Sequence, residues 1–170
     1  MRIEITEKIA VYLCGQAEAG YEMAYKQERI GFLFGTKGKS AIKITKAVAY
    51  KGGTKKRTNV DVYADSFDKR GEILATQLRK KWIGAYHTHV EIDDDIPVGI
   101  SEDDIDAFEE GESVVELIVS IWVTDNASRL KQGKKRLLAI KRFSDTNYRL
   151  SISGYVMTKR GPRLVRLIKV

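Results

Sequence analysis

The chain has 170 residues, of which 43% are hydrophobic, and its formal net charge is +7 at pH 7. This length and apolar content suit one domain with a sizeable core, so we expect a single domain over residues 1–170. No apolar run approaches the roughly 20 residues that a transmembrane helix needs, and the start lacks the apolar core of a signal peptide, so we expect a cytoplasmic protein without a membrane anchor.

The charged residues are unevenly distributed. No Lys or Arg occurs between Lys81 and Arg129, and thirteen acidic residues lie in that interval. From Arg129 to the end, thirteen Lys or Arg residues face a single acid, Asp145. The middle of the chain is therefore anionic and the last third cationic. Cys14 is the only cysteine, which excludes an intrachain disulfide and a zinc site made of thiolates.

The first half of the chain alternates strand and helix patterns. Ile9, Leu13 and Ala17 form one apolar stripe of a helix that Thr6 can cap. Period-two alternation in the segment that follows Lys39 indicates an antiparallel hairpin with one solvated face. The expected elements are a strand at Arg2–Ile5, a helix to about Ala19, strands at Ile30–Phe34 and Ser40–Tyr50, and a helix from Ser66 to about Lys80.

The second half begins with a buried strand at Trp82. Pro97 and Gly99 indicate that Val90–Ile100 is a loop, and Ser101 then starts a short helix ending at Gly111. Val114–Thr124 is the most apolar strand pattern and is predicted to be central in the sheet. A polar connection then leads to three basic strands at Arg136–Phe143, Tyr148–Thr158 and Leu164–Val170.

The only two histidines stand two residues apart on the Trp82 strand. His87 and His89 therefore project from the same face of it. Two imidazoles can bind one metal ion, and a carboxylate such as Asp104 supplies the third ligand of a catalytic zinc site that keeps a fourth position for water. The alternative is two half-buried histidines at the end of a strand.

A zinc site of this kind indicates amide hydrolysis, because zinc lowers the pKa of a bound water towards 7. Glu28 is the candidate acid/base, since we expect the strand that it precedes to neighbour the His87 strand. The Ser101 hydroxyl could donate a hydrogen bond to the oxyanion of the tetrahedral intermediate. Taken alone, Glu28 is a weak signal, since most Glu residues are solvated surface groups, and Ser101 with Asp104 is equally an ordinary capping box.

Three segments occur in a specific order: Glu28 ahead of Gly31-Phe-Leu-Phe-Gly35, then Trp82-Ile-Gly-Ala-Tyr-His87-Thr-His89, then Ser101-x-x-Asp104. Over roughly Ile3 to Thr124, this pattern resembles the signature of the JAMM (MPN/Mov34/PAD-1) metalloproteases of the stand-alone prokaryotic type.

The resemblance implies an α/β fold, a three-layer α/β/α sandwich around a mixed sheet like that of cytidine deaminases. It also implies one zinc ion per chain and cleavage of peptide or isopeptide bonds at the C-terminal tails of ubiquitin-like modifiers. It assigns His87, His89 and Asp104 as ligands, Glu28 as acid/base and Ser101 as oxyanion donor.

The sequence departs from the family pattern near the ligands. Val90 and Ile100 stand where the family usually has proline, and the loop between them is longer than usual and densely acidic. Asp103 or Asp106 would replace Asp104 as ligand if the helix began elsewhere, although the Ser-x-x-Asp spacing favours Asp104. The longer loop bears on substrate preference more than on the metal site.

Other functions stay open on the sequence alone. One is a catalytically silent scaffold or protein-interaction module of the same fold. Another is nucleic-acid binding through the basic C-terminal third, but Phe143, Tyr148 and Tyr155 have the spacing of core residues, which favours solvated outer strand faces instead. The expected partners are a ubiquitin-like modifier or its conjugates and no membrane; substrate identity and oligomeric state, including a homodimer, are left open.

The acidic loop Glu91–Asp95 also has two interpretations. It is either a solvated loop, or a lid that steers basic substrate segments or docks on the basic strands of the same chain.

Overall fold

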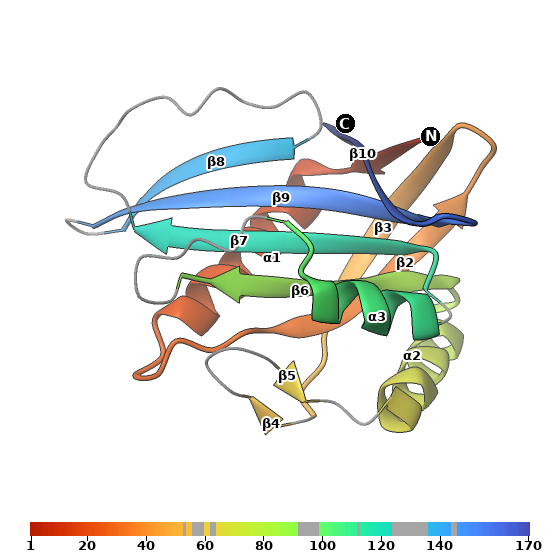
Figure 1. The fold of residues 1–170 in the computed structure, drawn as a ribbon, viewed down its shortest axis with the longest axis horizontal. Helices are drawn as coiled ribbons and strands as arrows, with labels where there is room; N and C mark the ends of the chain where they lie inside the picture. The colour runs from red at the N-terminus through yellow and green to blue at the C-terminus, as the bar shows by residue number, and fades with distance from the viewer. Residues whose placement is uncertain are drawn as a thin grey trace.

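The computed structural model describes residues 1–52, 54–55, 60–61, 64–91, 99–111, 113–123, 136–143 and 146–170. Strands predominate over helices in this part of the chain (Figure 1). In order, the elements are β1 (Arg2–Ile5), α1 (Glu7–Tyr21), β2 (Ile30–Lys37), β3 (Ala41–Ala49), β4 (Thr54–Lys55), β5 (Val60–Asp61), α2 (Ala64–Leu78), β6 (Trp82–Val90), α3 (Glu102–Glu110), β7 (Val115–Val123), β8 (Arg136–Phe143), β9 (Thr146–Thr158) and β10 (Gly161–Lys169).

The sheet closes on itself. Among the described strands the order is β10-β1-β3-β2-β6-β7-β9-β8, and β10 also pairs with β9, so seven strands form a closed mixed barrel and β8 extends from it. The pairs β1–β10, β1–β3 and β6–β7 are parallel, and the other pairs of this sheet are antiparallel. The expected three-layer α/β/α sandwich is therefore wrong, because that architecture needs an open sheet between two helical layers.

The length of β9 is the physical reason for closure. One edge of β9 pairs with β7, while β8 and β10 pair with successive segments, Thr146–Ser153 and Gly154–Thr158. β10 then continues alongside β1, where Arg166 lies opposite Arg2. The last strand thus joins the two sides of the sheet that a sandwich would leave as free edges.

The helices cover the two faces of the sheet. The Thr6 hydroxyl caps α1 by accepting from the Ile9 N–H at 3.3 Å, and the apolar stripe of this helix packs on the main hydrophobic core. α2 covers a cluster of aromatic residues around Phe32, and α3 covers another cluster around Ile118. In Figure 1, α1 passes behind β6 and β7 while α3 lies in front of them.

Two neighbour relations expected from the sequence are confirmed. β2, which follows Glu28, pairs antiparallel with β6 and places Ile30 opposite His87. β7 lies between β6 and β9, and its residues are buried from Val115 to Trp122, as a central strand requires.

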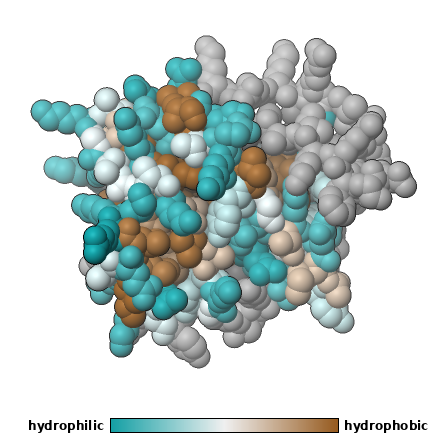
Figure 2. Space-filling view, turned by 180° about the vertical axis from the view of Figure 1, so that it is seen from behind, coloured by the Kyte–Doolittle hydropathy of each residue, from teal (hydrophilic) through white to brown (hydrophobic). Residues whose placement is uncertain are grey.

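The described surface on the back of the molecule is mostly hydrophilic, with separate apolar patches (Figure 2). Large exposed apolar side chains include Val11 and Ile73. None of the described helices has the length and apolar character needed to cross a membrane. Residues 92–95 of the acidic loop lie outside the described residues, as does the expected polar connection, residues 125–135.

Candidate metal centre

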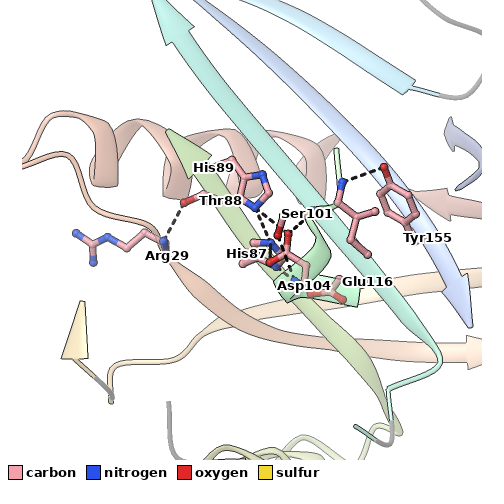
Figure 3. Close-up of polar contacts among 9 residues, drawn as sticks. Arg29, His87, Thr88, His89, Ser101, Asp104, Glu116 and Tyr155 are labelled. Atoms are coloured by element: carbon pink, nitrogen blue, oxygen red, sulfur yellow. Dashed lines mark hydrogen bonds and ion pairs between the residues drawn. The ribbon is translucent and has the colours of Figure 1, made fainter. Parts of the chain in front are cut away.

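β6 presents both histidines on the face that α3 covers. His87 and His89 are 8% and 4% exposed, so both rings are removed from solvent. Thr88 points to the other side, where its hydroxyl accepts a hydrogen bond from the Arg29 N–H at 2.8 Å (Figure 3). This bond ties the residue that follows Glu28 to the strand that carries the histidines.

Asp104 reaches the histidines from the first turn of α3. The Ser101 Oγ accepts from the Asp104 N–H at 3.2 Å, and Asp104 Oδ2 accepts from the Ser101 N–H at 2.8 Å. Tyr155 supports this turn, because its hydroxyl accepts from the Ile100 N–H at 3.1 Å. The Asp104 carboxylate is therefore both the acidic member of the capping box and the predicted ligand, and the start of the helix holds it in place.

The three predicted ligands converge closely. The Nε2 atoms of His87 and His89 lie 2.9 Å apart, His87 Nε2 lies 3.2 Å from Asp104 Oδ1, and His89 Nε2 lies 3.2 Å from Asp104 Oδ2. Two ligand atoms on one zinc ion, each about 2.0–2.1 Å from it at tetrahedral angles, are about 3.3 Å apart. The donor atoms and their separations therefore fit one zinc ion with a fourth position left for another ligand.

Glu116 is a site residue that the sequence analysis missed. Its Oε1 lies 2.9 Å from His87 Nδ1, the ring nitrogen that faces away from Asp104, and the residue is 8% exposed. A carboxylate on the second nitrogen of a histidine fixes the tautomer and the ring orientation, and it is a common support of metal-bound histidine. The available signal was one acid in the most apolar strand, since a buried charge needs a partner.

Glu28 lies beside this cluster, just before β2. The residue is 8% exposed, and burial raises the pKa of its carboxyl to about 8. The positive charge of His87 acts in the opposite direction, whereas the negative charge of Asp104 adds to the increase. A carboxyl with a pKa this close to neutrality can both accept and return a proton.

The charges of the cluster compensate one another. Burial disfavours a charged His87, but the hydrogen bonds that its ring donates to Asp104 and Glu116 outweigh burial and raise the pKa of the ring well above its ordinary value. Burial likewise opposes a charged Asp104, yet the two histidines hold the pKa of its carboxyl far below the usual range. Both shifts arise because buried donors and acceptors face one another here, and a metal bound at this place would compete with protons.

The remaining predicted positions are also resolved. Ser101 is exposed at the start of α3, and because its oxygen accepts from Asp104, its own hydrogen is free to donate elsewhere. Asp103 and Asp106 are exposed on α3, and the group of described residues that could hold a metal contains Asp104 instead. The structure thus brings His87, His89 and Asp104 together, with Glu28 beside them and Ser101 in contact with Asp104.

Comparisons with known proteins concern the fold only. No protein-family model matches the sequence, and no curated protein matches it. The solution structure of protein DSY2949 from Desulfitobacterium hafniense is similar with a TM-score of 0.63, at 13% sequence identity, over 99% of this chain and 92% of that one. Likeness at this level of identity shows a shared fold and carries no reaction with it.

Proposed function

We propose that this protein is a zinc-dependent hydrolase that cleaves peptide or isopeptide bonds, with the C-terminal tails of ubiquitin-like modifiers as substrates. The observation that carries the proposal is the convergence of His87, His89 and Asp104 beside a buried carboxyl, Glu28. The substrate class comes from the resemblance to the JAMM metalloproteases. The cytoplasm is the proposed location, which the single cysteine favours.

Each residue has a defined role in this proposal. His87, His89 and Asp104 hold the ion, which when bound supplies Lewis acidity at the scissile carbonyl. Glu28 removes a proton from the attacking water and returns it to the leaving amine, because its carboxyl is neutral or charged within the same pH range. Ser101 donates its free hydroxyl hydrogen to the oxyanion of the tetrahedral intermediate.

Glu116 has a supporting role. By accepting the Nδ1 hydrogen of His87, it directs the Nε2 lone pair of the same ring towards Asp104 and His89. It also keeps the ring from rotating, since both of its nitrogens are engaged.

The direct test combines metal analysis with a cleavage assay. The purified protein is expected to bind one zinc ion per chain and to release a fluorogenic amine from the C-terminus of a ubiquitin-like protein. Glu28→Gln should retain zinc and lose about 10²–10⁴-fold in kcat, because it cannot move the proton. Glu22→Gln is the matched control, since Glu22 is an exposed residue just after α1.

The outcomes separate the alternatives. A protein that cannot bind zinc would overturn the proposal. Zinc binding without cleavage of any modifier conjugate would favour the catalytically silent scaffold. Equal kcat in Glu28→Gln and the wild type would remove Glu28 from the reaction.

A further inference from the structure

Thr88 stands between the two histidines of β6 but faces the opposite side of the strand. Its side chain is 0% exposed, and its neighbours on that face, Tyr86 and Val90, belong to the main hydrophobic core. A hydroxyl buried among apolar side chains costs free energy unless it is hydrogen-bonded. The reason for a threonine at this place is therefore the bond that its hydroxyl makes.

The hydroxyl of Thr88 takes the place of a backbone acceptor. The Thr88 N–H donates to the Arg29 carbonyl at 2.8 Å, and the Arg29 N–H donates to Thr88 Oγ1 at 2.8 Å. In a regular antiparallel pair, two opposite residues exchange both bonds through their backbones. Here a side chain accepts the second bond, one residue beyond the pairing of Ile30 with His87. The hydroxyl thus holds the point at which the chain joins β6 as it enters β2.

Glu28 lies between two backbone anchors. The residue after it, Arg29, is held by Thr88, and the residue before it, Gln27, donates its N–H to the Gly20 carbonyl in the last turn of α1 at 3.0 Å. Among the described residues, no side-chain hydrogen bond holds the Glu28 carboxyl itself. The place of this carboxyl is therefore set by the backbone on either side of it.

The anchor at Thr88 also decides the direction of Glu28. Opposite residues of an antiparallel pair point to the same side of a sheet, and the Arg29 side chain extends away from the histidines, as Figure 3 shows. Successive side chains alternate, so Glu28 points to the side of His87 and His89. The effect of the His87 charge on the Glu28 carboxyl agrees with this placement. A shift of Arg29 along Thr88 would therefore move Glu28 relative to the ligands.

We propose that Thr88 is a positioning residue: its hydroxyl fixes the place of the Glu28 carboxyl relative to the metal ligands, without contact with metal or substrate. The inference rests on the proposed hydrolase function. Loss of the hydroxyl leaves the Arg29 N–H without this acceptor and releases one of the two anchors. A catalytic group that moves by about 1 Å can lose about 10²-fold in rate.

Thr88→Val tests the proposal in the zinc-loaded enzyme, because valine keeps the shape of threonine and lacks the hydroxyl. Its kcat should fall about 10–100-fold, while KM and zinc affinity should equal those of the wild type. Thr88→Ser keeps the hydroxyl and should restore most of kcat. Thr45→Val is the matched control and should keep the kcat of the wild type, since the Thr45 hydroxyl donates to β2 at another point, the Phe34 carbonyl at 3.4 Å.

A double variant tests whether Thr88 acts through Glu28. In the Glu28→Gln background, Thr88→Val should cause no further loss of kcat, because the group that Thr88 positions is already absent. An equal loss in both backgrounds would overturn the proposal, and so would a fall in zinc affinity that accounts for the loss. Full kcat in folded Thr88→Val would limit Thr88 to a structural role.

Amide hydrogen exchange of the metal-free protein gives a readout that does not depend on activity. In the wild type, the Arg29 N–H should be protected as well as the Thr88 N–H, its counterpart in the pair. Thr88→Val should speed the exchange of the Arg29 N–H about tenfold or more, and Thr88→Ser should not. Rapid exchange of Arg29 in the wild type would refute the role of Thr88 even where a variant does not fold. A wild type that binds no zinc would instead refute the proposed function.

Discussion

The two faces of β6 and β7 are built on opposite principles. Towards α1, these strands place Leu117, Val119 and Ile121 in the main hydrophobic core. Towards α3, the same strands bury two histidines and Glu116, which contact one another and Asp104. Apolar burial stabilises the first face, whereas buried charges on the second are tolerated because each has a partner. The inner face therefore holds the fold, and the outer face is available for chemistry.

His89→Ala tests the outer face and should have the largest effect. Removing a ligand should lower zinc affinity by more than the about 10–100-fold that follows loss of a supporting partner. The metal-free protein should keep its fold, because His89 belongs to none of the hydrophobic clusters. Competition with a zinc chelator and circular dichroism measure the two properties. Unchanged zinc affinity would exclude His89 as a ligand.

Leu117→Ala is the corresponding test of the inner face. Leu117 is fully buried in the main core, so its truncation should reduce the free energy of unfolding by about 2–5 kcal/mol. Urea unfolding measures this loss. The folded fraction should bind zinc as the wild type does, and a large drop in zinc affinity at low urea would show that the two faces are not separable.

Glu116→Gln should have a smaller effect than loss of a ligand. The amide no longer carries the charge that orients His87, so zinc affinity should fall about 10–100-fold. Glu110→Gln is the control for a lost negative charge, because Glu110 is an exposed residue at the end of α3. Chelator competition is again the measurement, and equal affinities for both variants would limit Glu116 to a structural role.

Glu28 gives the most gradual effect, a dependence of stability on pH in the metal-free protein. Its pKa is about 8 in the folded chain, against its ordinary value of 4.5, which we take for the unfolded chain. Between these values the folded state keeps a proton that the unfolded state has lost, so stability falls by about 1.4 kcal/mol for each pH unit of increase. Below the unfolded-state pKa, Glu28 is protonated in both states and no stability is lost. Above the folded-state pKa, it is ionised in both states and the loss of stability is complete.

Glu28→Gln does not titrate and should escape this fall. Its stability relative to the wild type should therefore rise across the same interval and stay constant above it. Urea unfolding after removal of metal by a chelator measures the difference at several pH values. Parallel profiles for the two proteins would show that Glu28 is not buried as the structure has it.

Local signals predicted much of the site. The capping signal at Ser101 located the turn that carries Asp104, and the spacing of the histidines placed both rings on one face. The neighbouring position of β2 and β6 was also expected, and the pairing of Ile30 with His87 confirms it. These features depend on residues close in sequence or on burial patterns.

The closure of the sheet and the role of Glu116 were not predicted, because both depend on pairing between strands that are distant in the sequence. Closure of the sheet depends on β10 pairing with both β1 and β9, and the alternating residues of β10 suit an edge strand as well as a closing strand. Glu116 became recognisable only when β7 was placed beside β6, because the sequence does not give the register of parallel strands. The family resemblance led to the sandwich, which the closing strand overturns.

The parallel arrangement of β6 and β7 means that α3 belongs to the crossover between them, so His87, His89, Asp104 and Glu116 come from one continuous stretch of chain. Only Glu28 comes from a distant segment, through the pairing of β2 with β6. Closing a short loop loses less entropy than closing a long one, so the ligands can assemble early in folding. In the proposed hydrolase, zinc binding would therefore require only one supersecondary unit, whereas catalysis would also require the pairing of β2 with β6.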